Sequence, residues 1–266
     1  MSIDLNELPA CLQPYKEQIV ATQKDSIEIN LSAADQLSLW QSKVGGHPYL
    51  PIGQQYPQSL EGENLQLLAQ INFAELPEND QYPKSGILQF FINPNDDLYG
   101  LDFDDQQKQD GFRVIFYDTV QQDDSALVQD FPVLGDDAYS PVSGQSAVQF
   151  EKAVSYIDLN NFDFASKVTD PYDKEDDESE EFCDEYSEVI SANGHRLGGY
   201  PFFTQSDPRE YNEDIQDYVL LLQIDTDDTD GIEIMWGDSG VGNFFIHPDD
   251  LKKRDFSKVL YNWDCY

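Results

Sequence analysis

The chain contains GGHP at residues 45–48, LLAQIN at 67–72 and FFINP at 90–94, and these segments return as GGYP at 198–201, LLLQID at 220–225 and FFIHP at 244–248. Eleven of the fifteen aligned residues are identical. The first two segments return after 153 positions and the third after 154, so one single-residue slip separates them. Three segments that keep their order and nearly their spacing indicate two related structural units.

The residues in and around these segments have the pattern of β-strands. Short apolar runs at 65–73 and 87–92 belong to the first copy, and runs at 218–225 and 232–236 belong to the second. Turns rich in glycine, proline or aspartate separate the runs, and strands do not alternate regularly with helices. We therefore predict an α+β fold of two related, mostly antiparallel β-sheet units, with helices at the N-terminus and the periphery.

The two units are predicted to form a single domain over residues 1–266. The repeat units span about residues 43–97 and 196–255, and each is expected to bury its aromatic side chains against the other. One N-terminal helix is expected to hold Pro14 in its first turn, and a second is expected to begin near Ser32.

Residues 170–188 form an acidic segment between the units. They contain eleven acidic residues and one lysine. Like charges at this density repel one another, which predicts an exposed loop or linker, with a short helix over 181–190 as the alternative. The carboxylates expected to contact a partner are Asp176, Asp177, Glu178, Glu180 and Glu181.

The charge balance narrows the class of partner. The chain has 52 acidic and 15 basic residues, which gives a net charge of −37. Such a field repels phosphate groups, so nucleic acids and membranes are not expected as partners, and a basic protein or a divalent cation fits better. Solubility alone is the other explanation of the charge. An aromatic content of 13% argues against disorder.

The sequence predicts a cytoplasmic protein without a cofactor. The N-terminus has neither a basic start nor an apolar run, and no stretch approaches the roughly 18 apolar residues of a membrane span. Cys11, Cys183 and Cys265 are far apart and form no Cys-x-x-Cys pair, which is typical of free thiols in a reducing compartment. The three histidines lack metal-ligand spacing, so no metal centre is expected.

One segment resembles a catalytic motif. Gly237-Asp238-Ser239-Gly240 matches the tetrapeptide around the nucleophile of trypsin-like proteases, and His47, Asp102 and Ser239 occur in the order of that family's triad. However, His47 stands in Gly-Gly-His-Pro-Tyr, which is not that family's histidine motif. A tight turn between strands explains the tetrapeptide better, so the sequence has no decisive catalytic signature and favours a non-enzymatic role.

Polar residues interrupt the apolar strands at equivalent positions of the two copies. Gln70 is equivalent to Gln223, and Asn72 is equivalent to Asp225. A polar side chain inside a buried strand needs a hydrogen-bonding partner. These side chains therefore either satisfy irregular parts of the sheet or line a cleft, and both explanations stay open. The candidate ligand-binding residues are Gln70, Asn72, Gln223, Asp225, Trp236, Asp238 and Ser239.

Residues 225–231 resemble a calcium-binding loop. Thr226, Asp228 and Asp230 take its first three ligand positions, but Gly237 stands where the bidentate glutamate would be. A turn of a β-hairpin between two strands explains the segment better. Weak surface binding of Ca²⁺ is the most that this pattern predicts.

A basic residue precedes each of the repeated glycine pairs. Lys43 stands before residues 45–46, and Arg196 stands before residues 198–199. A cation beside flexible glycines can receive an anion, because glycine lets backbone N–H groups approach closely. A bend that requires positive φ explains the glycines better, since no phosphate-binding motif accompanies them.

Five longer segments carry a family resemblance. They are KVGGHPYLP at 43–51, LAQINF at 68–73, GILQFFI at 86–92, WGDSG at 236–240 and YNWDCY at 261–266. Together they resemble the YwqG-like family of bacterial proteins, over nearly the whole chain from residue 26 onward. The resemblance implies a bacterial, cytoplasmic member of a family classed as a domain of unknown function, with no catalytic residues to transfer. An association of related proteins with secreted-toxin systems suits an immunity role.

These observations favour a non-enzymatic, acidic protein-binding module with a regulatory or toxin-immunity-like role. The acidic residues 176–181 and the edge near 225–230 are the surfaces expected to meet a basic partner. The alternative is a small-molecule-binding protein or a hydrolase with a cleft between the two repeat units, because such junctions are favoured positions for pockets.

Overall fold

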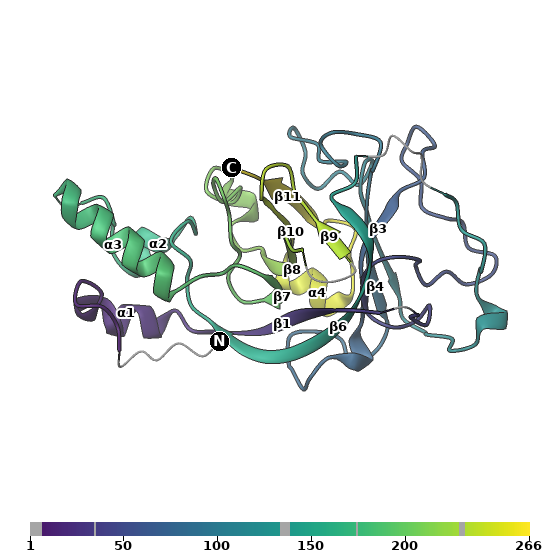
Figure 1. Cartoon of the computed structure of the whole chain (residues 1–266), viewed down its shortest axis with the longest axis horizontal. Helices are drawn as coiled ribbons and strands as arrows, with labels where there is room; N and C mark the ends of the chain where they lie inside the picture. Colours follow the sequence, from purple (N-terminus) through teal and green to yellow (C-terminus); the bar gives the residue numbers. More distant parts are fainter. Residues whose placement is uncertain (1–6, 35, 134–138, 174, 229–231) are drawn as a thin grey trace.

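The computed structural model shows an antiparallel β-sheet with a helical extension at one end (Figure 1). It describes residues 7–34, 36–133, 139–173, 175–228 and 232–266. The strands are β1 (Lys24–Ala33), β2 (Lys43–Gly45), β3 (Gln66–Asn72), β4 (Ile87–Ile92), β5 (Arg113–Tyr117), β6 (Val142–Ser155), β7 (His195–Gly198), β8 (Val219–Asp225), β9 (Ile232–Ile234), β10 (Val241–Ile246) and β11 (Leu260–Asp264). The α-helices are α1 (Lys16–Ala21), α2 (Phe164–Lys167), α3 (Asp176–Val189) and α4 (Pro248–Lys253). Within the described residues, no helix has the length and apolar character needed to cross a bilayer.

The paired strands are antiparallel, and their order is symmetric about the centre of the sheet. The order is β11-β10-β8-β7-β1-β6-β2-β3-β4-β5, and β9 pairs with the start of β6. The central strands β1 and β6 pair from Lys24↔Ser155 to Ala33↔Ser146. Outward from this pair, β7, β8, β10 and β11 on one side correspond to β2, β3, β4 and β5 on the other. The prediction of a mostly antiparallel sheet with peripheral helices is confirmed.

The repeated segments lie on corresponding strands. LLAQIN lies in β3 and LLLQID in β8, with FFI of each copy in β4 and β10. Each ladder shifts register at the same place, since Leu68 is skipped in the pairing with β4 and Leu221 is skipped in the pairing with β10. The glycines 45–46 and 198–199 have φ angles of 68°, 70°, 67° and 72°. The explanation of the glycine pairs as positive-φ bends is therefore confirmed.

One hydrophobic core contains side chains from both halves of the sheet, the strands on either side of the central pair β1 and β6. The rings of Phe90 in β4 and Phe244 in β10 have centroids 4.8 Å apart, and those of Phe112 and Tyr261 are 5.1 Å apart. All four residues are fully buried. Removing either half of the sheet would expose the aromatic rings of the other half to water.

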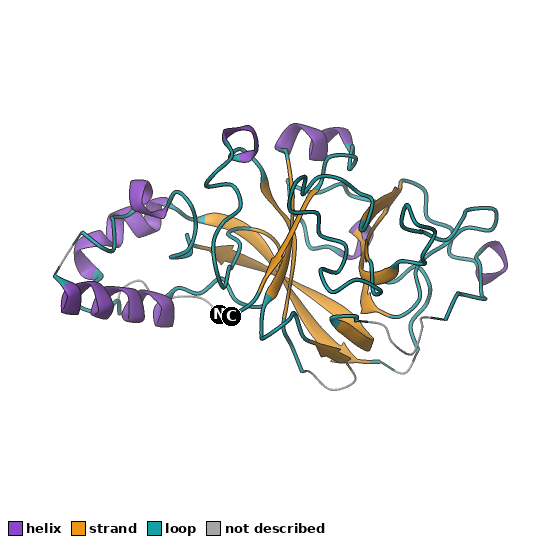
Figure 2. Cartoon of the chain, turned by 90° about the horizontal axis from the view of Figure 1, so that it is seen from above, coloured by secondary structure: helices purple, strands orange, loops and turns teal. Residues whose placement is uncertain are grey.

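Helices α1, α2 and α3 lie together at one end of the molecule, away from most of the strands (Figures 1 and 2). A second hydrophobic cluster holds them together. In this cluster Phe164 of α2 packs against Phe182 and Tyr186 of α3, with the Phe164 and Tyr186 rings 4.9 Å apart. Ile19 of α1 is fully buried in the same cluster. We call this part of the structure, residues 8–21 and 156–190, the helical end.

The prediction that residues 170–188 form a loop or linker is wrong over most of its length, because α3 spans Asp176–Val189. Ser179, Phe182 and Tyr186 face inward at helical spacing, while the carboxylates lie on the remaining faces. Acidic residues in the first turn also favour the positive end of the helix dipole. Burial of two aromatic rings therefore outweighs the repulsion among carboxylates that stay in water.

The predicted second helix near Ser32 does not form. Ser32 and Ala33 continue β1, where they pair with Ala147 and Ser146 of β6. The described residues 36–42 are not helical either. Hydrogen bonding to the long strand β6 thus overrides the local preference for a helix start.

Strands β8 and β9 do not form the predicted hairpin. β9 pairs with β6, and only an isolated bridge between Asp227 and Ile234 connects the two sides of the turn. Residues 229–231 of the predicted turn lie outside the described part of the chain. β8 instead lies between β7 and β10, which complete its hydrogen bonds on both edges.

Candidate functional site

Gln70 is buried and its amide binds the backbone of neighbouring segments. Its Nε2 donates to the carbonyl oxygens of Leu39 at 2.8 Å and Gln41 at 2.7 Å. Its Oε1 accepts a hydrogen bond from the Tyr49 N–H at 2.7 Å. The two N–H donors of the amide therefore hold the chain before β2, and its oxygen holds the chain after β2.

Gln223 makes the same three contacts in the other half of the sheet. Its Nε2 donates to the carbonyl oxygens of Ala192 and Gly194, both at 2.7 Å, and its Oε1 accepts from the Phe202 N–H at 2.8 Å. Each of these partners stands 153 positions after its counterpart around Gln70. We call these two arrangements the glutamine clasps. In both, the buried polar side chain satisfies backbone groups that no strand partner reaches.

The other candidate ligand residues are dispersed. Asn72 is buried, and its Nδ2 donates to the Trp40 carbonyl at 2.9 Å. Trp236 is fully buried in the main core, where its ring lies 5.7 Å from that of Tyr99. Asp238 and Ser239 are exposed in the turn after it. The seven predicted residues therefore do not face one common cavity among those described below.

The three residues in protease order are engaged elsewhere. His47 stacks on Phe131 with ring centroids 4.7 Å apart, and Asp102 forms an ion pair with Lys108 at 3.2 Å. Ser239 adopts φ 58° in the tight turn that the sequence favoured. Among the described residues, no group of three or more metal-ligating side chains is gathered, and Asp230 of the calcium-loop pattern lies outside them.

Buried charges lie behind the clasp of Gln223. The Asp158 carboxylate accepts from the N–H groups of Asn160 at 3.0 Å and Ala192 at 3.4 Å. Burial raises the pKa of Asp158 to about 6, and the nearby Arg196 guanidinium only partly opposes this. Asp158 thus binds the same residue, Ala192, whose carbonyl the glutamine holds.

His195 and Asp225 hold the other side of the same segment. The Asp225 carboxylate accepts from the Gly194 N–H at 2.7 Å, and burial raises the pKa of Asp225. His195 Nδ1 accepts from the Asp225 N–H at 3.0 Å. The proton of the neutral ring therefore lies on Nε2, which donates to the Asp227 carboxylate at 2.9 Å. Asp225 is thus a positioning residue of the chain between α3 and β7.

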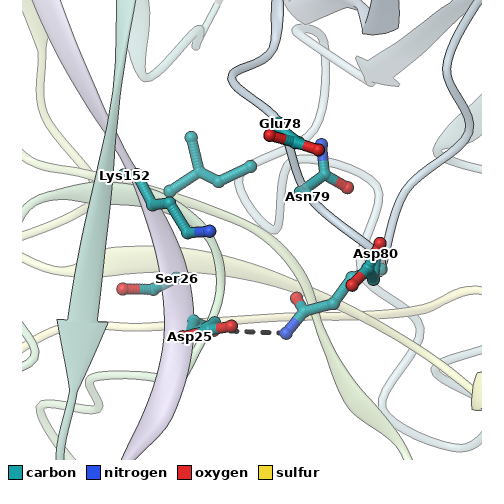
Figure 3. A pocket seen from close by; sticks show the side chains of 8 residues that line it. Asp25, Ser26, Glu78, Asn79, Asp80 and Lys152 are labelled. Atoms are coloured by element: carbon teal, nitrogen blue, oxygen red, sulfur yellow. Dashed lines mark hydrogen bonds between the residues drawn. The ribbon is translucent and has the colours of Figure 1, made fainter.

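A groove lies where the two halves of the sheet meet, and the loop 78–82 forms one of its walls (Figure 3). It consists of two adjoining cavities of 290 Å³ and 370 Å³, which share Asp25, Asp80 and Gln81. Gln81 Nε2 donates to the Asp25 carbonyl at 3.3 Å, and the Tyr82 hydroxyl donates to the Leu221 carbonyl at 3.2 Å. We call this feature the junction groove.

The junction groove combines apolar and charged groups. Ile27, Val219, Leu220 and Leu251 supply apolar surface. The charged residues that line it are Lys24, Asp25, Glu78, Asp80, Lys152 and Lys252. The one sequence motif noted above that lies near the groove is the glycine pair 198–199. Glycine at 198 leaves room for loop 78–82, since a Cβ atom there would come within 2.7 Å of Gln81 Oε1. The loop that forms its wall carries no recognisable motif.

A second cleft, of 270 Å³, lies between the helical end and the segment 205–210. Its lining includes Asp170, Tyr172, Asp207 and Glu210, and no lysine or arginine among the residues that the structure describes. Asp207 is already paired with Arg209, whose Nε lies 2.8 Å from Oδ1. We call this feature the acidic cleft. Its side toward the helical end is formed in part by Phe164, the ring that packs on α3.

Comparison with known protein families matches residues 42–265 to a family described as a domain of unknown function, DUF1963. The chain belongs to this family. The match covers both clasp glutamines, Gln70 and Gln223, the junction groove from loop 78–82 onward and α3, while Leu39 and Gln41 of the first clasp lie just before it. No curated protein matches the chain.

We predict that Gln223→Leu destabilises this DUF1963 protein strongly. The substitution keeps the size of the side chain but leaves two buried carbonyl groups and one N–H without a partner, each costing about 1–3 kcal/mol. Chemical denaturation should therefore show a loss of roughly 3–6 kcal/mol in the free energy of unfolding. The exposed control Gln121→Leu should change it by less than about 0.5 kcal/mol. Equal stability of the two variants would show that the clasp is dispensable.

We predict that Asp158 makes the stability depend on pH. Because its pKa is raised to about 6 in the folded protein, the folded state holds this proton more tightly than the unfolded state. The resulting stabilisation is fully present below about pH 4 and is lost as the pH rises through 6. Denaturation between pH 4 and pH 7 should show a smaller pH dependence for Asp158→Asn than for the wild type, and the exposed control Asp173→Asn should behave like the wild type. The same slope in all three proteins would contradict the assignment.

Proposed function

We propose that this protein is a non-enzymatic protein-binding module that engages a basic partner through its helical end. The observation that carries the proposal is a firmly packed helix, α3, whose exposed residues are mostly carboxylates and which stands beside the acidic cleft. A field of net charge −37 would attract such a partner from a distance and make the association fast and sensitive to salt.

The helical end supports binding because α3 is held in one position. Phe182 and Tyr186 are buried to 1% and 0% exposure and anchor one face of the helix in the cluster with α1 and α2. The five carboxylates predicted to contact a partner are all exposed on the first turns of the helix. A surface that is already ordered loses little conformational entropy on binding.

The acidic cleft favours arginine or lysine as the contacting side chain. The Tyr172 ring at its edge is 76% exposed, and Glu210 beside it is exposed too. A guanidinium group can contact a carboxylate and stack on an aromatic ring at the same time, and an ammonium group is also attracted to a ring face. An exposed ring among carboxylates is therefore suited to a basic segment.

We predict that removing carboxylates from α3 weakens the binding of a cationic peptide. The variant Asp177→Asn, Glu180→Gln, Glu181→Gln should bind a labelled oligoarginine peptide about tenfold more weakly than the wild type at low salt, as measured by fluorescence anisotropy. Higher salt should weaken binding to the wild type and narrow the difference, because screening acts on exposed charges.

The matched control removes three exposed carboxylates elsewhere. The variant Glu61→Gln, Asp104→Asn, Asp130→Asn removes the same number of negative charges and leaves the helical end unchanged. The proposal requires this control to bind the peptide nearly as well as the wild type. If both triple variants lose the same affinity, the peptide responds to the overall charge and α3 is not the binding surface.

A second candidate function is small-molecule binding in the junction groove, either as a binding protein or as a hydrolase. It is supported by the position of the groove between the two halves and by its apolar surface with a few convergent charges. Figure 3 draws Lys152 facing Glu78 and Asn79 across the groove. The amine is thus placed to contact a polar group of a ligand.

We expect a fragment screen by NMR to find compounds that shift the amide signals of Gln81, Tyr82 and Leu251 together. The substitution Lys152→Met should weaken the binding of those compounds severalfold. The exposed control Lys258→Met should leave their binding unchanged, because Lys258 lies outside the groove. This function would be contradicted if the compounds shifted amide signals all over the surface, or if they bound the Lys152→Met variant as tightly as the wild type.

We also propose that the two halves arose by duplication and that the protein is a YwqG-like, cytoplasmic bacterial member of its family. Besides the clasps, two further pairs of contacts support the duplication. Gln89 and Asn243 each donate through the side-chain amide to a carbonyl, of Tyr49 and Phe202. Similarly, the N–H of Asn72 is accepted by Ser42, and that of Asp225 by His195. In each case the second member stands 153 or 154 positions after the first.

A further inference from the structure

Lys43 is a buried lysine at the wall of a large cavity. The cavity has a volume of 570 Å³ and lies on the first half of the sheet, between the segment 36–47 and the residues Asp124, Gln129 and Gln145. Lys43 is only 1% exposed, and its Nζ donates to the carbonyls of Ser38 at 2.9 Å and His47 at 3.1 Å. Both residues also line the cavity, so the ammonium group lies at its wall.

The ammonium group of Lys43 has no direct ionic partner among the described residues. No ion pair joins it to a carboxylate there, and Glu75 influences it only from a distance. An ammonium group has three N–H donors, and the two carbonyls take two of them. Burial lowers the pKa of Lys43 to about 8, since the charged form has lost its water. The third N–H of the ammonium group and its positive charge both suit an anionic group.

The corresponding cation in the other half has its counter-charges. Arg196 stands 153 positions after Lys43; burial lowers the pKa of its guanidinium, and the carboxylates of Glu28, Asp158 and Asp225 oppose this by favouring the charged form. Asn72 stands at the position of Asp225 in the first half, so one of those carboxylates is replaced by a neutral amide. Arg196 lines none of the cavities described above. The half that lacks the carboxylate is thus the half that has a cavity beside the cation.

The rest of the cavity wall is rich in neutral polar groups. Gln36, Gln129 and Gln145 contribute amides. The Ser38 hydroxyl is buried and has no hydrogen-bonding partner within the described structure. Asp124 is the one acidic residue of the lining within the described part of the chain. Such a wall can form hydrogen bonds with hydroxyl or amide groups, and its single carboxylate disfavours a ligand of high negative charge.

We propose that this cavity is a binding site for a small polar molecule with one carboxylate, which Lys43 receives through its free N–H while the glutamines and Ser38 bind the hydroxyl or amide groups of the ligand. The volume is within the range of about 300–1,000 Å³ that small-molecule sites occupy. A monoanion fits better than a phosphate dianion, because the protein carries −37 and the wall includes Asp124. This site is separate from the helical end and from the junction groove.

The test compares ligands that differ only in the carboxylate. Gluconate and glucitol have the same polyhydroxy chain, and glycerate and glycerol form a smaller pair of the same kind. Titrations followed by NMR should show saturable binding of at least one acid, with shifts at Ser38, His47 and Gln145, and about tenfold weaker binding of the matching alcohol. The Lys43 amine signal should report a pKa that rises on binding, because a bound anion stabilises the ammonium form.

Variants separate ligand recognition from a structural role of the lysine. The substitution Lys43→Met should weaken the binding of the acid about tenfold and leave the binding of the alcohol unchanged. The exposed control Lys84→Met should bind both compounds as the wild type does. If Lys43→Met does not fold, Gln129→Ala serves instead, since Gln129 is an exposed wall residue whose loss should weaken the same acid severalfold. The proposal is overturned if no acid binds saturably, if each alcohol binds as tightly as its acid, or if inorganic phosphate binds more tightly than both acids.

Discussion

The structure depends on two buried glutamine amides that bind backbone groups outside the strand ladders. Gln70 and Gln223 each hold two carbonyls and one N–H of segments that flank strands β2 and β7, which lie next to the central pair β6 and β1. Those segments turn at glycine pairs and cannot complete their hydrogen bonds by strand pairing alone. Without the amides, buried backbone groups would be left unsatisfied at the places where the chain enters and leaves the centre of the sheet.

The same frame carries different chemistry in its two halves. Behind the second clasp, Asp158, Asp225 and Arg196 form a group of compensating charges, and His195 replaces the hydroxyl of Ser42 as the acceptor of an N–H. Around the first clasp, Lys43 is the buried cation; among the described residues, carboxylates equivalent to Asp158 and Asp225 do not accompany it, and it lines a cavity. The two halves thus share backbone geometry and differ in the side chains around it, which is how one scaffold can hold different local chemistry in its two halves.

Much of the sheet could be predicted from the chain, because strand signals are local. The predicted run over 87–92 coincides with β4. Gln70 and Gln223, equivalent in the sequence, also make equivalent hydrogen bonds in the structure. Predictions failed where a distant partner decided the outcome. Ser32 extends β1 because β6 pairs with it, and the acidic segment becomes α3 because Phe182 and Tyr186 find a hydrophobic partner in α2.

The sequence alone determined the strand pattern, the repeated segments, the polar positions within the strands and the large negative charge, since each is a property of residues or of their spacing. Only the tertiary structure decided that the two glutamines bind backbone and line none of the cavities described above, since their partners lie up to 31 residues away. It likewise decided the position of the junction groove, where loop 78–82 meets β8, and of the cavity beside Lys43, where segment 36–47 meets Asp124, Gln129 and Gln145. Cavities form between segments distant in sequence, and no local pattern encodes their meeting.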